Sequence, residues 1–377
     1  MTEETQSKLS PMMRQYLAIH ETVPDAFLLF RLGDFYEMFF DDAIKASKLL
    51  DLTLTGRDCG LEERAPMCGV PYHAVDSYIA RLVDKGYKVA ICEQTSDPKL
   101  SKGLVEREIT RIVTSGTLTD LSAVKEDRNN YLMCVYYNKL SFGVAYCDIT
   151  TGEMTAQFLT GKDAAESFFN LLSTVNPAEI IVNGVIFQSE ELKQRALRIT
   201  GRQFTPLASS EFSYDKCVEE ILTQLDCYSL NAAGLEECDE MIKSCGALFA
   251  YLRQTQKNSL KHINKIKVVT NKGNMHLDYA TKRNLELTET LRGGEKKGSL
   301  LWVMDKTVTS VGARTLNSWL NEPLLERDKI EERQDALSEL TGDLMLLEDL
   351  QYFLKRTCDI QRISSRLAFG SANGRDL

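Results

Sequence analysis

FLLFRLGDFYEMFFDDAIKASKLL, residues 27 to 50, joins two apolar runs through a glycine and continues into a helical pattern. The run 27–30 predicts a buried strand, and Gly33 permits a bend before the next piece. Acidic residues then open the segment 41–50, which suits the start of a helix because negative charge opposes the helix dipole. The stretch therefore predicts a strand, a bend, an extended piece and a helix in succession.

One face of the extended piece combines an aromatic ring with a carboxylate. Phe35, Glu37 and Phe39 point to the same side of a strand, with Phe35 and Glu37 about 6–7 Å apart along it. An unpaired buried carboxylate is unfavourable, so this face is expected to be solvated or to meet another molecule. A ring that stacks beside a hydrogen-bonding group suits a nucleic-acid base, whereas the ordinary alternative is a core residue beside a rim residue. Spacing alone leaves both interpretations open.

Length and composition indicate a multidomain globular chain. At 377 residues, with 43% hydrophobic and 26% charged residues, two or three domains are expected. No apolar run reaches the roughly 18–20 residues that cross a bilayer, and the first residues do not form a signal-peptide pattern. The 10 cysteines include no C-x-x-C pair, so reduced thiols in a cytoplasm fit better than a zinc site or a disulfide framework.

Charge is unevenly distributed along the chain, whose formal net charge is −9. Residues 1–115 hold 14 basic and 18 acidic residues, residues 116–249 hold 10 and 19, and residues 250–377 hold 21 and 17. The acidic middle third would repel phosphates. If the chain touches nucleic acid, we expect the contact to come from local patches in the outer thirds.

Alternating strand and helix patterns over 1–115 predict a small α/β domain. The expected helices cover 9–22, 41–50 and 74–85, the expected strands include 27–32, 87–92 and 107–114, and 53–63 is expected to form a loop or hairpin tip. Arg107 and Arg111 alternate along the last strand with Ile109 and Val113. Five basic residues are candidates for contacts with a phosphate backbone, and the alternative for each is an ordinary solvated side chain. They are Arg57, Lys99, Lys102, Arg107 and Arg111.

The pattern changes after a polar stretch that reads as a linker. Strands are expected at 131–137, 141–149, 154–159 and 179–182, with a helix at 163–174. From about residue 250 the pattern is helical, over 278–291, 300–320 and 330–353. The hydrophobic periodicities of these segments predict a second α/β domain followed by an all-α region.

Several long motifs resemble the MutS family of DNA mismatch repair proteins, in the family's order and spacing. They are GDFYEMF with the helix after it, APMCGVPYHAV at 65–75, ICEQ at 91–94, MHLDYATKRNLELTETLRGG at 275–294, TSVGARTLNSWLNEPL at 309–324 and DIQRISSRLAFGSANGRDL at 359–377. The resemblance implies a mixed α/β mismatch-binding domain at 1–115, a linker at 116–129, a ribonuclease-H-like connector domain at 130–249 and the start of a helical core domain at 250–377.

The resemblance also implies a function. Phe35 would wedge against a mispaired base from the minor groove, and Glu37 would hydrogen-bond the displaced base. Met67 would approach the groove from the turn at 65–75, although a cap over a small core is an equal alternative. The implied partners are mismatched double-stranded DNA, a MutL-type repair protein and a second MutS subunit, in a bacterial cytoplasm and without a membrane.

No catalytic group is expected in these residues. In the family, a clamp and an ATPase domain that uses ATP and magnesium follow the helical core. The run Gly293–Ser299 comes near a phosphate-binding loop but lacks the lysine that the pattern needs after Gly298, and no strand precedes it. The chain is therefore interpreted as a non-catalytic fragment of the family architecture, with no cofactor of its own.

Two other functions remain open. A nuclease could be built on the middle domain, where Asp148 occupies the place of a first-strand acid, but the sequence offers no second and third acid at strand ends. A non-catalytic interaction scaffold, or a fragment inactive in DNA binding, is the other alternative.

Overall fold

The computed structural model describes residues 8–95, 105–119, 125–235, 238–257, 260–269, 273–275, 277–370, 372 and 374. The chain divides into two compact units. The first contains Met1–Ala123 and Tyr251–Ser259, and the second contains Val124–Ala250 and Leu260–Leu377.

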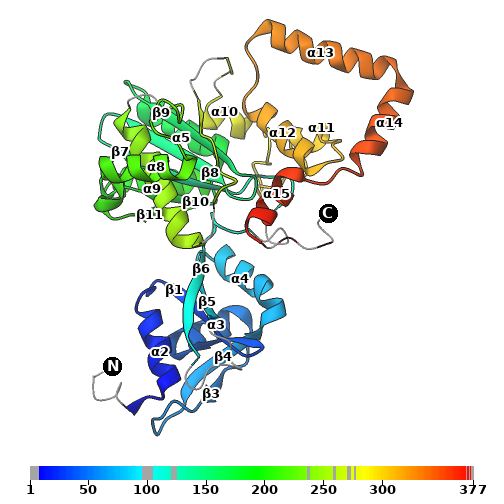
Figure 1. Cartoon of the computed structure of the whole chain (residues 1–377). Coiled ribbons are helices and arrows are strands. Elements are labelled where there is room, and N and C mark those ends of the chain that lie inside the picture. Colours follow the sequence, from blue (N-terminus) through cyan, green and yellow to red (C-terminus); the bar gives the residue numbers. More distant parts are fainter. Residues whose placement is uncertain are drawn as a thin grey trace. The chain divides into compact units, whose positions relative to one another are not determined.

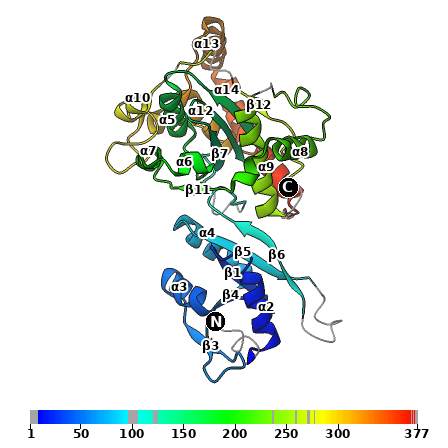
Figure 2. The ribbon, with the colours of Figure 1, turned by 90° about the vertical axis from the view of Figure 1, so that its left-hand side faces the viewer.

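The first unit is built on one six-stranded sheet (Figures 1 and 2). Its strands are β1 (Ala26–Leu32), β2 (Phe35–Phe39), β3 (Thr55–Arg57), β4 (Ala65–Pro71), β5 (Lys88–Gln94) and β6 (Arg107–Val113). They lie in the order β3-β4-β2-β1-β5-β6, with β1 parallel to β5 and the other neighbours antiparallel. The expected hairpin at 53–63 joins β3 to β4.

Helices cover both faces of this sheet. They are α2 (Pro11–His20), α3 (Phe40–Leu50), the 3-10 turn η1 (Tyr72–Ala74) and α4 (Val75–Asp84). α3 and α4 pack on the face that carries Tyr36 and Met38, and α2 packs on the face that carries Phe30 and Phe39. The small α/β domain expected from the sequence is confirmed.

The second unit holds a second six-stranded sheet. Its strands are β7 (Tyr131–Tyr137), β8 (Phe142–Asp148), β9 (Glu153–Leu159), β10 (Glu179–Val182), β11 (Phe204–Pro206) and β12 (Lys267–Val268). β7, β8 and β9 form an antiparallel meander, and β10 and β11 extend it in parallel beyond β7. The accompanying helices are α5 (Ala164–Val175), α6 (Gly184–Phe187), α7 (Glu190–Thr200), η2 (Ser209–Phe212), α8 (Tyr214–Leu225) and α9 (Asp239–Gln256), and the residues of α9 from Tyr251 on are assigned to the first unit.

Helices sandwich this sheet as well. α5, α6 and α7 pack over one face, where the rings of Phe142 and Phe168 stack with centroids 4.8 Å apart. The start of α9 approaches the other face so closely that a Cβ on Gly143 would lie 1.9 Å from the carbonyl oxygen of Glu240. Only glycine therefore fits at this crossing of β8 and α9.

The remainder of the second unit is helical, as expected. Its helices are α10 (Tyr279–Asn284), α11 (Leu300–Met304), α12 (Ser310–Asn321), α13 (Arg327–Gly342), α14 (Leu344–Leu354) and α15 (Ile360–Ala368). The helical pattern predicted over 278–291 is wrong in its second half. α10 stops at Asn284, because Glu286 has a φ of 49° and Gly293 and Gly294 also take positive φ in the loop that follows.

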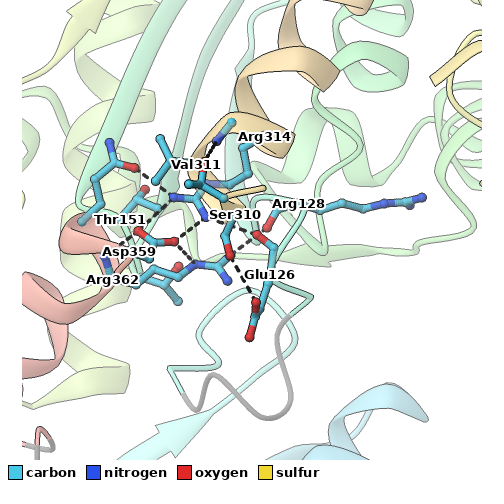
Figure 3. A network of polar contacts seen from close by, with 12 residues as sticks. Glu126, Arg128, Thr151, Ser310, Val311, Arg314, Asp359 and Arg362 are labelled. Atoms are coloured by element: carbon cyan, nitrogen blue, oxygen red, sulfur yellow. Dashed lines mark hydrogen bonds and ion pairs between the residues drawn. The ribbon is translucent and has the colours of Figure 1, made fainter. Parts of the chain in front are cut away.

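A polar network ties residues 125–128 to α12 and α15 within this unit (Figure 3). Arg362 donates from Nη2 to the carbonyl oxygens of Lys125, at 3.2 Å, and Arg128, at 2.7 Å. Arg314 pairs with Asp359 at 2.6 Å and donates to the carbonyl oxygen of Glu126 at 3.2 Å. The backbone just beyond the first unit is thus held by side chains more than 180 residues away.

Candidate nucleic-acid interface

The turn between β1 and β2 sets the orientation of Phe35. Gly33 has a φ of 59°, which suits the two-residue connection of this hairpin. The next residue along β2, Tyr36, is buried, and its hydroxyl hydrogen-bonds the carboxylate of Glu93. Because side chains alternate along a strand, the anchored Tyr36 directs Phe35 to the opposite face, where its side chain is 47% exposed.

Phe39 shares this face but is covered. Its ring meets that of Tyr16 of α2 edge-on, with centroids 4.9 Å apart, and its backbone N–H donates to the Tyr16 hydroxyl at 3.3 Å. Phe39 is 1% exposed. α2 therefore closes one end of the face over β2, and the end that carries Phe35 stays open.

Glu37 lies between these two ends and is paired with Arg57. Its carboxylate Oε2 accepts from Nη1 of Arg57 on β3, and the side chains are 14% and 37% exposed respectively. Gly69 stands opposite Glu37 on the intervening strand β4. A Cβ there would lie 3.3 Å from Cγ of Glu37, so the glycine leaves room for the glutamate side chain to reach towards β3. The sequence predicts that this carboxylate is solvated or meets another molecule, and the structure pairs it within the fold.

Met67 lies on the same face of the sheet. It pairs with Phe39 across β2 and with Thr55 across β3. Its side chain is half-buried and packs against the core under α2, while Thr55 Oγ1 donates to its carbonyl oxygen at 3.2 Å. The open patch on this face is therefore made of Phe35, Glu37, Arg57, Thr55 and the exposed part of Met67; we call it the β2–β3 face.

The structure contradicts the prediction that Arg107 contacts a phosphate. Arg107 is 7% exposed and its guanidinium lies over the ring of Phe30, 4.9 Å from the ring centroid. Nε donates to the carbonyl oxygen of Arg31 at 2.8 Å, and Nη1 donates to Gln15 and to Val105. Arg107 and Ile109 face the core together, since two-residue spacing puts both on one side of the strand. Arg107 is thus a structural residue here.

The other basic candidates fall into two groups. Arg111 is half-buried, and its Nη2 donates to the carbonyl oxygen of Thr117 at 3.0 Å. Lys99 and Lys102 lie outside the described residues. Of the predicted backbone contacts that lie within the described residues, Arg57 alone is placed on the β2–β3 face.

The acid that suggested a nuclease, Asp148, lies in an environment that gives it a structural role. Asp148 is fully buried, and its carboxylate accepts from the backbone N–H of Asn130 at 3.0 Å and from the N–H and hydroxyl of Thr150 at 2.9 and 2.7 Å. Across the described ranges of the chain, no three His, Cys, Asp or Glu side chains gather as metal ligands would. Asp148 holds the turn after β8.

A cavity that the sequence did not indicate lies in the second unit. It measures about 880 Å³, and its walls include Tyr131, Tyr146 and Glu322 as well as Lys282 of α10. Burial lowers the pKa of Lys282 to about 8, and its Nζ donates to Thr174 of α5. The lining of the cavity contains both acidic and basic side chains, so the charge of the cavity does not favour one class of ligand.

The sequence missed two features of the β2–β3 face. It predicted neither the pairing of Arg57 with Glu37 nor the role of Gly69 in making room for it. The only sequence signal was the glycine within the constrained turn at 65–75, which becomes informative once β2 and β4 are known to be neighbours.

Comparison with known proteins assigns the chain to a family. Residues 10–122 match the sequence model of MutS domain I, residues 130–264 that of MutS domain II, and residues 280–377 that of MutS domain III. The described helices include none long and apolar enough to span a membrane.

Curated relatives are similar over nearly the whole chain. The DNA mismatch repair protein MutS of Acetivibrio thermocellus is 46% identical over 371 residues, that of Ruminiclostridium cellulolyticum 46% over 369, and that of Alkaliphilus oremlandii 45% over 379. Each alignment covers 98% of this chain and 42% of the relative, so the chain spans about two fifths of their length. With its α/β units, its helical region and its matches to domains I, II and III, the chain belongs to the MutS family.

Proposed function

We propose that this chain recognises mispaired or unpaired bases in duplex DNA as the mismatch-binding part of a MutS protein. The observation that carries the proposal is the exposed ring of Phe35 at the open end of a sheet face, next to an anchored Tyr36. An aromatic wedge on a rigid strand is suited to entering a base step from the minor groove. The names of the relatives, DNA mismatch repair protein MutS, support the same role.

Selectivity would come from the deformability of the duplex. Unstacking a base step costs a few kcal/mol, and the cost is lowest where pairing is already faulty. Phe35 would therefore enter at a mismatch more readily than at a paired step, without reading a base code. Glu37 would then hydrogen-bond the displaced base; while ionised it only accepts hydrogen bonds, so bonding to a base acceptor requires its protonation.

We propose that ATP binding and repair signalling depend on parts of the MutS architecture beyond the residues of this chain. ATP and magnesium would bind in the part of the relatives that this chain does not span, and repair would be signalled through a MutL-type protein and a second MutS subunit. Lys296, in the glycine-rich run that resembles a phosphate loop, is held by Asp127 and Asp305 at 3.0 and 2.7 Å, which supports a structural role for that run. The residues of this chain are proposed to be non-catalytic.

The test is Phe35→Ala, measured by fluorescence anisotropy on matched and mismatched duplexes of equal length. We expect the preference for the mismatched duplex to fall to about one, while the free energy of unfolding changes by about 1 kcal/mol because the ring is half-exposed. Phe158→Ala, at a ring of similar exposure in the second unit, is the control. A preserved preference in Phe35→Ala together with a large loss of thermal stability would contradict the proposal.

A scaffold is the second candidate function. α14 exposes large apolar side chains, among them Leu344, Met345 and Phe353, and exposed apolar patches often mark protein contacts. Equal affinity for matched and mismatched duplexes in the unchanged chain would favour this candidate.

A further inference from the structure

We propose that Arg57 is a positioning residue for Glu37: it holds the carboxylate in the free protein and moves to a DNA phosphate when a displaced base takes its place. The proposal rests on the mismatch-recognition function above. It assigns to Arg57 a part in discriminating between duplexes, beyond that of a general basic contact.

The geometry of the β2–β3 face supports this exchange. Glu37 and Arg57 come from strands separated by β4, and Gly69 leaves the space through which the glutamate side chain reaches towards β3. The Glu37 side chain is the more buried of the two, at 14% exposed against 37% for Arg57. Arg57 is thus the partner with access to solvent, and hence to a phosphate.

The pairing of Glu37 with Arg57 determines which charges on this face are available to a duplex. While the pair is closed, the charge of Glu37 is neutralised and Arg57 offers no free cation to the backbone. A fully matched duplex supplies no displaced base, so it gives Glu37 no alternative partner and the pair stays closed. Arg57 would then contribute little to binding of matched DNA.

A displaced base opens the pair without leaving either charge bare. Glu37 exchanges the guanidinium for the base, and Arg57 exchanges the carboxylate for a phosphate oxygen, which is an equally good acceptor for a charge-assisted hydrogen bond. An unpaired charge at a half-buried site would be costly, so the two exchanges are coupled. The mismatched complex therefore gains one phosphate contact that the matched complex lacks.

This extra contact has a measurable signature. Each phosphate neutralised by a basic side chain adds about 0.9 to the negative slope of log affinity against log salt. We expect the unchanged chain to show a steeper slope on a mismatched duplex than on a matched one, by about this amount. Glu37→Gln removes the carboxylate and releases Arg57, so it is expected to steepen the slope on the matched duplex by about 0.9 as well.

A double-mutant comparison tests whether Arg57 is the group released. In an Arg57→Met background, Glu37→Gln is expected to leave the matched-duplex slope unchanged; in an Arg57→Lys background, the steepening is expected to return. Arg64→Met, at an exposed arginine of the same hairpin, is the matched control and should preserve the steepening. If Glu37→Gln steepens the matched-duplex slope equally in the Arg57→Met background and in the chain that keeps Arg57, the proposal is overturned. The removal of negative charge alone would then explain the change in slope.

Two further outcomes separate this proposal from the proposed function. Equal binding of matched and mismatched duplexes by the unchanged chain would reject mismatch recognition, while the matched-duplex slopes would still decide the role of Arg57. The pair itself is tested without DNA, through the guanidinium ¹⁵N signals of Arg57 in the whole chain. We expect them to shift in Glu37→Gln; unchanged signals would overturn the proposal whatever the DNA result.

Discussion

Three consecutive side chains of β2 meet three different environments. Phe35 is exposed, Tyr36 is buried with its hydroxyl on Glu93, and Glu37 is mostly buried but paired with Arg57. The alternation of the strand places Phe35 and Glu37 on one face, and the absence of α2 from that end leaves Phe35 accessible. A rigid strand, anchored from its other face, is a firm support for the proposed entry of Phe35 into a base step.

Gly69→Ala tests the space beside Glu37. The new Cβ would lie 3.2 Å from the carbonyl oxygen of Tyr36 and 3.3 Å from Cγ of Glu37. Since the sheet holds the carbonyl, we expect the glutamate side chain to rotate away from Arg57, mismatch preference to fall several-fold, and stability to fall by about 1 kcal/mol. Binding assays and thermal melting measure these effects.

Gly184→Ala is the control for this substitution, because no atom lies within 4 Å of a Cβ there. It is expected to leave both affinity and melting temperature nearly unchanged. Full mismatch preference in Gly69→Ala would show that the space opposite Glu37 is not required.

At the scale of elements, α10 shows how tertiary contacts define a short helix. Asp278 caps it by accepting from the N–H of Thr281 at 2.6 Å, and Asn170 of α5 accepts from the N–H of Tyr279 at 3.0 Å. Lys282 then extends to Thr174, also on α5. These contacts dock six residues firmly on α5, and the chain turns away after them.

Lys282→Met tests the cost of burying this amine. Burial lowers its pKa from 10.5 to about 8, so between these pH values the unfolded chain binds more protons than the folded chain. The contribution of Lys282 to stability is therefore lost as pH falls through 8 and regained as pH rises to 10.5. Relative to Lys282→Met, we expect the free energy of unfolding of the unchanged chain to rise by about 1–3 kcal/mol over this range.

Urea unfolding at several pH values, with thiols kept reduced, measures this difference. Lys306→Met, at an exposed lysine, should follow the unchanged chain at every pH. Parallel stability profiles for Lys282→Met and the unchanged chain would contradict a perturbed amine in α10.

At the scale of the whole molecule, the arginine network of Figure 3 fixes the backbone that follows the residues matching domain I. Arg362 is 1% exposed and reaches two carbonyl oxygens of residues 125–128, while Arg314 reaches a third. Ser310 adds a hydrogen bond to the Glu126 carboxylate at 3.1 Å. Residues 125–128 are thus held in a fixed position on α12 and α15 within the second unit.

Arg362→Met tests this attachment. The substitution leaves the carbonyl oxygens of Lys125 and Arg128 without their buried donor, and we expect the second unit to lose about 2–4 kcal/mol of stability. Hydrogen exchange at residues 125–130 should accelerate, as measured by mass spectrometry. Arg327→Met is the control, since Arg327 forms an exposed i,i+4 pair with Glu331 that contributes little. Unchanged exchange at 125–130 would show that Arg362 does not hold this segment.

Sequence patterns anticipated most strands and helices but few of the contacts between them. The strands at 27–32 and 131–137 and the helix at 74–85 are present within a few residues of their predicted ends. The strand pattern predicts a phosphate contact for Arg107, whereas the structure buries it against Phe30. A strand pattern shows which residues share a face, and it does not show which face the fold covers.

The sequence by itself determined the order of elements, the two α/β units, the helical region and the family, because hydrophobic periods and motifs are properties of neighbouring residues. The tertiary structure alone decided that Glu37 is held by Arg57, that Arg107 turns inwards, and that Arg362 holds residues 125–128. Each depends on side chains brought together from 20 to 237 positions apart. Local propensity carries no information on such pairs; packing of the sheets and helices selects them.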